Sequence, residues 1–253
     1  MSNVLAIAQK ELRSYFSSPI GYVLVGLFAL LFGWFFYNYL AIFVRNSEQM
    51  MAGGQTPNLN QHLVRGVLLN SAVIILFLMP MITMRTYSEE KRSGTIELLL
   101  TSPLSDAQII LGKFFGAMGL YAAMLGVTLL YMLILFWYGD PEWKPIAAGY
   151  LGLLLMGGCF VSMGLLVSSL TKNQIVAGVA TFALFLFLWV INWIGESAGP
   201  MTREIVTYLS ITEHFDDFAR GVIDTKHLVY YLSFITFGLF LTAKSVDSER
   251  WRG

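Results

Sequence analysis

The sequence contains little charge and almost no cysteine. Only 13% of its 253 residues are charged, whereas 56% are hydrophobic and 15% are aromatic. A composition this apolar excludes an ordinary water-soluble domain. The formal net charge is zero, so we expect no nucleic-acid partner. The single cysteine, Cys159, cannot form an intrachain disulfide, and its apolar surroundings favour a packing role over a catalytic thiol.

Motifs for nucleotide or metal chemistry are also missing. No G-x-x-x-x-G-K-[ST] sequence occurs, because Gly112-Lys113 is followed by Phe114, which has no hydroxyl group to hold Mg²⁺. No two histidines are spaced as His-x-x-x-His; the three are His62, His214 and His227. A metalloprotease or other intramembrane hydrolase is therefore not favoured. We expect a non-catalytic chain that binds no metal or cofactor of its own.

Long uncharged stretches occur six times, at residues 20–44, 66–84, 114–139, 145–171, 173–195 and 227–243. Each is near or above the roughly 20 residues needed to cross about 30 Å of hydrocarbon. The last is the shortest, but Lys226 and Lys244 at its ends can extend their ammonium groups toward the lipid headgroups. The sequence therefore predicts an all-α polytopic membrane protein, with residues 1–253 forming one domain of six transmembrane helices in the lipid bilayer.

The interior of these spans offers asparagine, serine and threonine instead of charge. Ion-coupled carriers usually keep an ionisable residue inside the bilayer, so this pattern favours an amphipathic, lipid-linked or apolar substrate, or no substrate. For Asn38, Asn70 and Asn192, hydrogen bonds between helices are a better interpretation than substrate binding. Gly112-x-x-x-Gly116 and Ala29-x-x-x-Gly33 permit close helix approach. Pro80 is a candidate hinge in the second span.

Residues 1–18 have the pattern of an amphipathic helix. Leu5, Ala8, Leu12 and Tyr15 recur at spacings of three and four, and Ser18-Pro19 ends the pattern. The charged residues of the segment are Lys10, Glu11 and Arg13. A helix this short and charged does not span, so we expect it to lie in the membrane interface. The alternative is a solvated helix packed on a soluble partner.

Between the second and third spans, residues 85–105 form a charged segment. Ser93-Gly94 breaks the preceding helix, and residues 95–101 can form two helical turns before Pro103 prevents continuation. Ser105 and Gln108 have the spacing of a capping box, which predicts a new helix there. Composition alone also allows a plain polar loop between two membrane helices.

Basic residues predict the orientation of the chain. With both termini cytoplasmic, the inner segments hold more lysine and arginine than the outer ones, as the positive-inside rule requires. The segment 85–105 then faces the cytoplasm, and residues 45–65 and 196–226 are outer loops. We expect the first outer loop to be irregular. The second contains an amphipathic helix ending near Gly221, and we interpret its Asp216-Asp217 pair as a solvated face, because adjacent helical positions point about 100° apart.

The run EEKRSGTIELLLTSPLS resembles the loop between the second and third spans of ABC-2-type transporter permeases. The matching positions are Glu89, Glu90, Gly94, Thr95, Glu97, Leu98, Leu99 and Pro103. HFDDFARGVID also resembles an outer loop of a subset of that family that includes the gliding-motility-associated permeases.

This resemblance implies that residues 95–101 form a coupling helix seated in a cleft of a partner ATPase. Glu89, Glu90, Arg92 and Glu97 would make polar contacts, Gly94 would allow the backbone to approach sharply, and Ile96, Leu98, Leu99 and Leu100 would anchor the helix. Two ATPase subunits would bind ATP and Mg²⁺, and a second permease chain, identical or related, would pair with this one. The implied location is the bacterial cytoplasmic membrane, and the implied activity is export of an amphipathic or lipid-linked substrate.

Two other functions remain open from the sequence. The chain could be an anchor or mechanical transmitter that moves an extracytoplasmic protein through residues 196–226 without transporting anything. It could also be a channel or ion-coupled carrier acting alone. Flux without an ATPase would identify the latter, and nucleotide-dependent changes without flux would identify the former.

Overall fold

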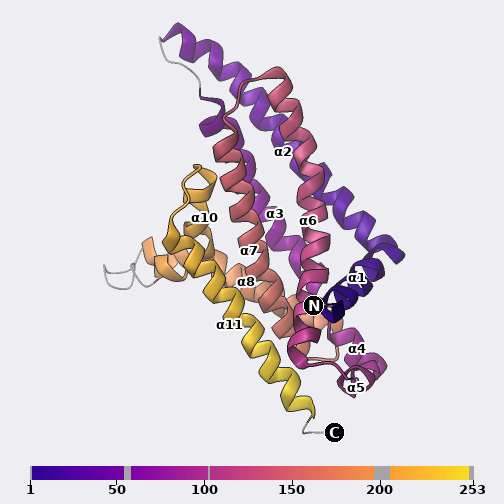
Figure 1. Ribbon diagram of the computed structural model, residues 1–253. Coiled ribbons are helices and arrows are strands. Elements are labelled where there is room, and N and C mark those ends of the chain that lie inside the picture. Colours follow the sequence, from indigo (N-terminus) through magenta and orange to yellow (C-terminus); the bar gives the residue numbers. More distant parts are fainter. Residues whose placement is uncertain (1, 54–57, 102, 197–205, 251–253) are drawn as a thin grey trace.

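The computed structural model describes residues 2–53, 58–101, 103–196 and 206–250, and this part of the chain is helical without strands (Figure 1). Six of the described helices are long and apolar enough to cross a membrane. They are α2 (Pro19–Ala52), α3 (Arg65–Thr83), α6 (Asp106–Tyr138), α7 (Trp143–Ser169), α8 (Gln174–Glu196) and α11 (Thr225–Arg250). The chain is therefore an all-α polytopic membrane protein, as the sequence predicts.

Helix α7 lies at the centre of the bundle and packs against α3, α6, α8 and α11. Small residues allow these neighbours to approach closely. A Cβ atom at Gly157 would lie 2.1 Å from the ring of Tyr121 in α6, and one at Gly164 would lie 2.2 Å from the hydroxyl of Thr83 in α3. Contacts of this kind matter in lipid, where helices gain little hydrophobic energy by associating.

Several helices extend beyond the predicted spans. Helix α2 continues through Arg45 to Ala52, and a π-helical turn, η1 (Asn60–Val64), precedes α3, so the expectation of an irregular loop at 45–65 is wrong for its described part. Residues 54–57 lie outside the described chain. Helix α11 likewise continues to Arg250. Charged residues end the apolar stretch but not the helix, since backbone hydrogen bonds continue into the polar region.

The predicted breaks between helices are confirmed. Helix α1 (Ser2–Ser17) ends two residues before Pro19, where α2 begins. Gly94, at a left-handed φ of 72°, separates α4 (Ser88–Ser93) from α5 (Thr95–Leu100). At the start of α6, the Gln108 amide donates to Ser105 Oγ over 3.3 Å and the Ser105 amide donates to Gln108 Oε1 over 3.2 Å, which completes the capping box.

Both close-approach motifs are confirmed. Gly112 and Gly116 face α1, where added Cβ atoms would lie 2.5 Å from the Cβ atoms of Ile7 and Glu11. At the other motif, the Tyr131 hydroxyl lies 2.5 Å from the position of a Cβ on Gly33 and donates to the Ala29 carbonyl over 3.1 Å. Helix α1 therefore packs tightly on α6, whereas its place in the membrane interface stays a prediction.

The asparagines behave differently from one another. Asn70 Nδ2 donates to the Tyr39 hydroxyl of α2 over 2.9 Å, so the predicted interhelical bond is confirmed there. Asn38 donates instead to Trp34 O of its own helix over 2.8 Å, so the prediction is wrong at that position. The side chain of Asn192 lies outside the described part. Pro80 is inside α3, three residues before the helix ends, and its role as a hinge stays a prediction.

We predict that Gly116→Ala lowers the midpoint of thermal unfolding in detergent. The new methyl group would collide with Glu11 Cβ, and overpacking of this kind costs about 1–3 kcal/mol, where each kcal/mol corresponds to about 2–4 °C. Gly126→Ala on the same helix is the matched control, because nothing lies within 4 Å of its added Cβ. Equal midpoints for the two variants would contradict the close packing of α1 on α6.

Candidate functional site at the α4–α5 segment

Helices α1, α4, α5, the start of α6 and the end of α11 gather at one end of the bundle (Figure 1). At the opposite end, α10 (Ile211–Ala219) lies beside the starts of α3, α7 and α11. The segment that carries most of the predicted coupling residues therefore shares an end with the N-terminal helix.

A single hydroxyl group fixes the turn between α3 and α4. The backbone amides of Tyr87 and Ser88 donate to Ser168 Oγ in α7 over 3.0 and 3.1 Å. The Ser168 hydroxyl in turn donates to the Met84 carbonyl over 3.0 Å. Because Ser168 is fully buried, no water competes for these bonds, and the direction in which α4 leaves α3 is fixed.

Lys113 of α6 forms the centre of a buried ionic cluster. Its ammonium group lies 3.0 Å from Glu11 Oε1, 2.8 Å from Glu90 Oε1 and 2.9 Å from the Thr86 carbonyl. The three N–H groups of the ammonium thus have three acceptors. Its side chain is only 1% exposed, so the pairing is what makes burial of the charge tolerable. The cluster joins α1, α4 and α6.

Three further contacts fasten the same region. Lys10 Nζ of α1 lies 3.8 Å from Glu90 Oε1, which adds a second cation to the cluster. The Tyr15 hydroxyl of α1 donates to Ile82 O of α3 over 3.0 Å. Lys91 of α4, whose side chain is 3% exposed, pairs with Glu249 near the end of α11 over 2.6 Å. Helix α4 is consequently held by α1, α6, α7 and α11.

Helix α5 is attached much more sparsely. Its contacts are mainly with α4, and a hydrogen bond between the Ser93 and Thr95 hydroxyls spans the break at Gly94. Ile96 is buried, whereas Leu98 is 73% exposed and Glu97 is exposed. The side chain of Leu98 points away from the protein, and its role in anchoring α5 in a partner ATPase stays a prediction. The side chains of Leu99 and Leu100 are outside the described part.

The predicted site residues fall into two groups. Those facing outward include Glu89, which pairs over 3.1 Å with Arg85 in the turn before α4, together with Lys10, Arg13, Arg92, Thr95, Glu97 and Leu98. Those facing inward are Glu11, Glu90 and Ile96. The sequence did not predict a site role for Lys113, because this residue only borders an uncharged stretch. Its place between Gly112 and Gly116 could have indicated that it lies near α1.

At the opposite end, the prediction that Asp216 and Asp217 form a solvated face is wrong. One face of α10 packs against α3, α7 and α11, with Phe215 and Phe218 buried, whereas Glu213 is exposed. Asp216 pairs with Arg65 of α3 over 2.6 Å, whereas Asp217 lies 2.7 Å from His227 of α11. Because adjacent positions on a helix point about 100° apart, the two carboxylates contact different neighbouring helices.

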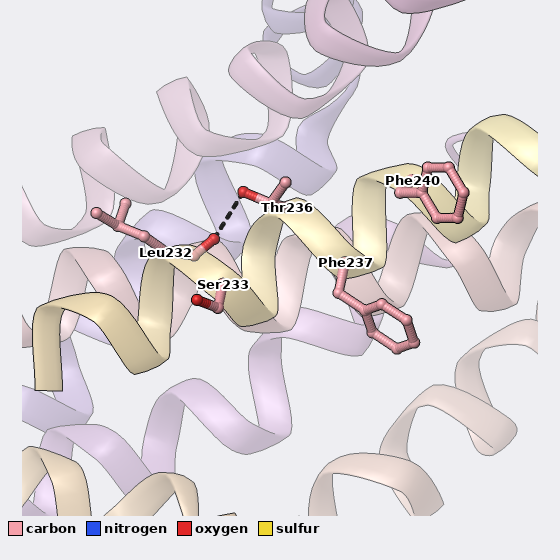
Figure 2. Close-up of a pocket in the computed structure, with 5 residues that line it drawn as sticks. All are labelled: Leu232, Ser233, Thr236, Phe237 and Phe240. Atoms are coloured by element: carbon pink, nitrogen blue, oxygen red, sulfur yellow. Dashed lines mark hydrogen bonds between the residues drawn. The ribbon is translucent and has the colours of Figure 1, made fainter. Parts of the chain in front are cut away.

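A shallow apolar groove runs along the outward face of α11 (Figure 2). It is lined by Leu232, Ser233, Thr236, Phe237 and Phe240. The Thr236 hydroxyl donates to the Leu232 carbonyl over 2.8 Å and is thereby satisfied within its own helix. All of the lining comes from one helix, so the groove is an apolar surface suited to contact with lipid and not a cavity enclosed between spans.

Comparison with known proteins covers nearly the whole chain. The model of a family described as ABC-2 family transporter proteins matches residues 5–243. Two relatives, from Escherichia coli K12 and Escherichia coli O157:H7, each carry the name probable multidrug ABC transporter permease YbhR. Each is 26% identical over 201 residues, covering 73% of this chain and 54% of the relative. The chain therefore spans about half the length of the curated relatives it matches.

We predict that Lys113→Met destabilises the protein strongly, by about 3–5 kcal/mol, because it leaves Glu11 and Glu90 buried without their central partner. Combining it with Glu11→Gln and Glu90→Gln should recover most of the loss, since no unpaired charge then remains buried. Thermal unfolding in detergent measures both effects. If Lys113→Met alone is as stable as the wild type, the cluster does not hold α1, α4 and α6 together.

Proposed function

This chain belongs to the ABC-2 family of transporter proteins, and from that premise we propose that it is the membrane-spanning permease subunit of an ATP-driven transporter. In this proposal two copies of a separate ATPase supply hydrolysis, with ATP and Mg²⁺ bound by them. A second permease chain, identical or related, completes the membrane part. The α4–α5 end faces the cytoplasm of a bacterial cell, and both termini lie on that side of the cytoplasmic membrane.

The observation that carries the proposal is the contrast between α4 and α5. Helix α5 exposes the side chains of Leu98 and Glu97 on the surface of the protein. An exposed apolar side chain beside a charged one suits contact with a protein partner. Helix α4 is fastened to α1, α6, α7 and α11. A partner that displaces α5 therefore pushes on α4, which transmits the displacement to several spans together.

The spans favour an amphipathic or lipid-linked compound as the exported substrate. Lys113 is the buried lysine in the described spans, and its ammonium group is already occupied by three acceptors near one end of α6. The multidrug function in the name of the relatives points in the same direction, toward apolar and amphipathic compounds. Reconstitution with an ATPase that co-purifies with this chain, followed by flux of fluorescent amphiphiles, tests transport directly. ATP hydrolysis without flux would favour a mechanical transmitter.

We predict that Glu97→Lys reduces ATPase activity coupled to the permease, while the variant still inserts and assembles. The reversal changes an exposed charge on α5, so it leaves the fold intact and alters only the surface offered to the partner. Asp140→Lys, an exposed reversal in the turn between α6 and α7 at the other end, is the matched control. Unchanged assembly, hydrolysis and transport in Glu97→Lys would count against the role of α5.

We also predict that replacing two apolar residues of α5 by serine has different effects. Leu98→Ser should leave the unfolding midpoint unchanged, because Leu98 is already exposed, and should weaken ATPase binding at least tenfold. Ile96→Ser should lower the midpoint, because Ile96 is buried. Binding is measured by co-purification over a concentration series. A Leu98→Ser protein that binds the ATPase normally would contradict the proposed interface.

A further inference from the structure

Two buried histidines face each other where α10 meets α11. The Nδ1 atoms of His214, in α10, and His227, in the first turn of α11, are 2.6 Å apart. The outer nitrogens also have partners: His214 Nε2 lies 3.0 Å from the Tyr208 carbonyl, and His227 Nε2 lies 2.7 Å from Asp217 Oδ2. The groups form one continuous chain from a backbone carbonyl to a carboxylate.

The number of protons in this chain follows from its ends. Each of its three hydrogen bonds needs one hydrogen, and neither a carbonyl nor a carboxylate supplies any. Two neutral imidazoles carry one N–H each and thus provide only two hydrogens. Satisfying all three bonds therefore requires one additional proton.

The extra proton lies toward the Asp217 end. His214 must donate from Nε2 to the Tyr208 carbonyl, so its Nδ1 is free to accept from His227 Nδ1 when His214 is neutral. Burial lowers the pKa of His214 below its ordinary value, which favours that neutral form. His227 then donates at Nδ1, and the third hydrogen lies between His227 Nε2 and Asp217. The three side chains are together electrically neutral, as imidazolium with carboxylate or as neutral imidazole with carboxylic acid.

A metal ion does not fit this arrangement. Zinc bonds to histidine nitrogen at about 2.0–2.1 Å, so two imidazoles on one ion stand more than 3 Å apart. The separation of 2.6 Å between the two Nδ1 atoms is that of a short hydrogen bond.

We propose that His214, His227 and Asp217 form a binding site for a single proton, and that this proton fastens α10 to α11. The site is placed to do so because His214 and Asp217 come from α10 while His227 comes from α11. Neighbouring contacts support the same junction: the His214 ring stacks on Tyr230 at 3.8 Å, and the Tyr231 hydroxyl donates to the Ile211 carbonyl over 2.9 Å.

Other ionisable groups surround the pair. Lys226 pairs with Asp224 in the turn before α11 over 3.3 Å, and Asp216 pairs with both Arg65 of α3 and Arg220 just after α10. Glu213 shares α10 with the site. The phenols of Tyr208, Tyr230 and Tyr231 surround the rings. Helix α7 contacts α10 through Gly152, and its Pro145 lies against Gly221 just after α10; neither residue ionises. Ordinary pKa values of acids, lysine, arginine and tyrosine lie outside the range from about pH 6.5 to 8.5.

The pH dependence follows from the proton count. When α10 separates from α11, the imidazole rings become solvated. A solvated imidazole is mostly neutral well above pH 6.5, so the separated form then holds only two of the three protons. Docking then takes up one proton. The docked form is therefore favoured at pH 6.5 and loses its advantage as the pH rises, by at most about tenfold per pH unit.

Asp217→Asn gives a sharp test because an amide supplies the missing hydrogen. Its NH₂ group donates to His227 Nε2, so two neutral histidines complete the chain without an extra proton. Hydrogen exchange of the α10 amides, measured in nanodiscs and corrected for intrinsic rates, should show wild-type protection falling roughly tenfold between pH 6.5 and 8.5. Protection in Asp217→Asn should not fall over that range, because its docked form holds no extra proton. His62→Gln, which removes the exposed histidine of η1, should follow the wild type.

The outcomes separate a proton site from a merely structural contact. A wild-type profile without pH dependence, or an Asp217→Asn profile parallel to that of the wild type, would overturn the proposal. Nitrogen NMR of histidine-labelled His62→Gln protein gives a second measurement. At pH 6.5 it should show one ring protonated only at Nε2, and a second ring protonated at Nδ1 whose Nε2 shares a proton with Asp217. Two rings that titrate independently near 6.5 would also exclude the site.

Discussion

The buried ammonium group of Lys113 is the interaction on which the α4–α5 end of the molecule depends. Helices in lipid gain little by hiding apolar side chains from one another, so their positions are set by close packing and by polar contacts. Close packing and polar contact occur together at Lys113, because the neighbouring glycines, which have no side chain, allow α1 to pack closely against the backbone of α6. Glu11 and Glu90 then meet the charge. Without the glycines Glu11 would be too far away, and without the lysine its carboxylate could not be buried.

At the two ends of the bundle, the helices are held together by different chemical groups. At the α4 end the helices are joined by ion pairs and by one serine hydroxyl. At the α10 end they are joined in part by the hydrogen-bonded chain of His214, His227 and Asp217. Between these polar ends, glycines of α7 lie against Tyr121 of α6 and Thr83 of α3.

Much of the fold could be predicted because its signals are local. The six spans follow from apolar length, the break at Gly94 from its conformational freedom, and the start of α6 from the Ser105–Gln108 pair. What could not be predicted depends on pairs far apart in sequence. Lys113 and Glu11 are separated by 102 positions, and Arg65 and Asp216 by 151. A carboxylate in a polar segment looks solvated until the helix that brings its partner is placed.

The same long-range contacts connect the two ends mechanically. Helix α11 carries His227 against α10 at its start and Glu249 against Lys91 at its end, separated by about 33 Å of continuous helix. Helix α7 likewise touches α10 at Gly152 and holds the α3–α4 turn at Ser168. Helix α3 begins with Arg65, which binds α10, and leads directly into the turn before α4. Three helices therefore contact both α10 and the α4 region, and each is stiff along its axis. A displacement of α4 that moves these helices along their axes must strain their contacts with α10.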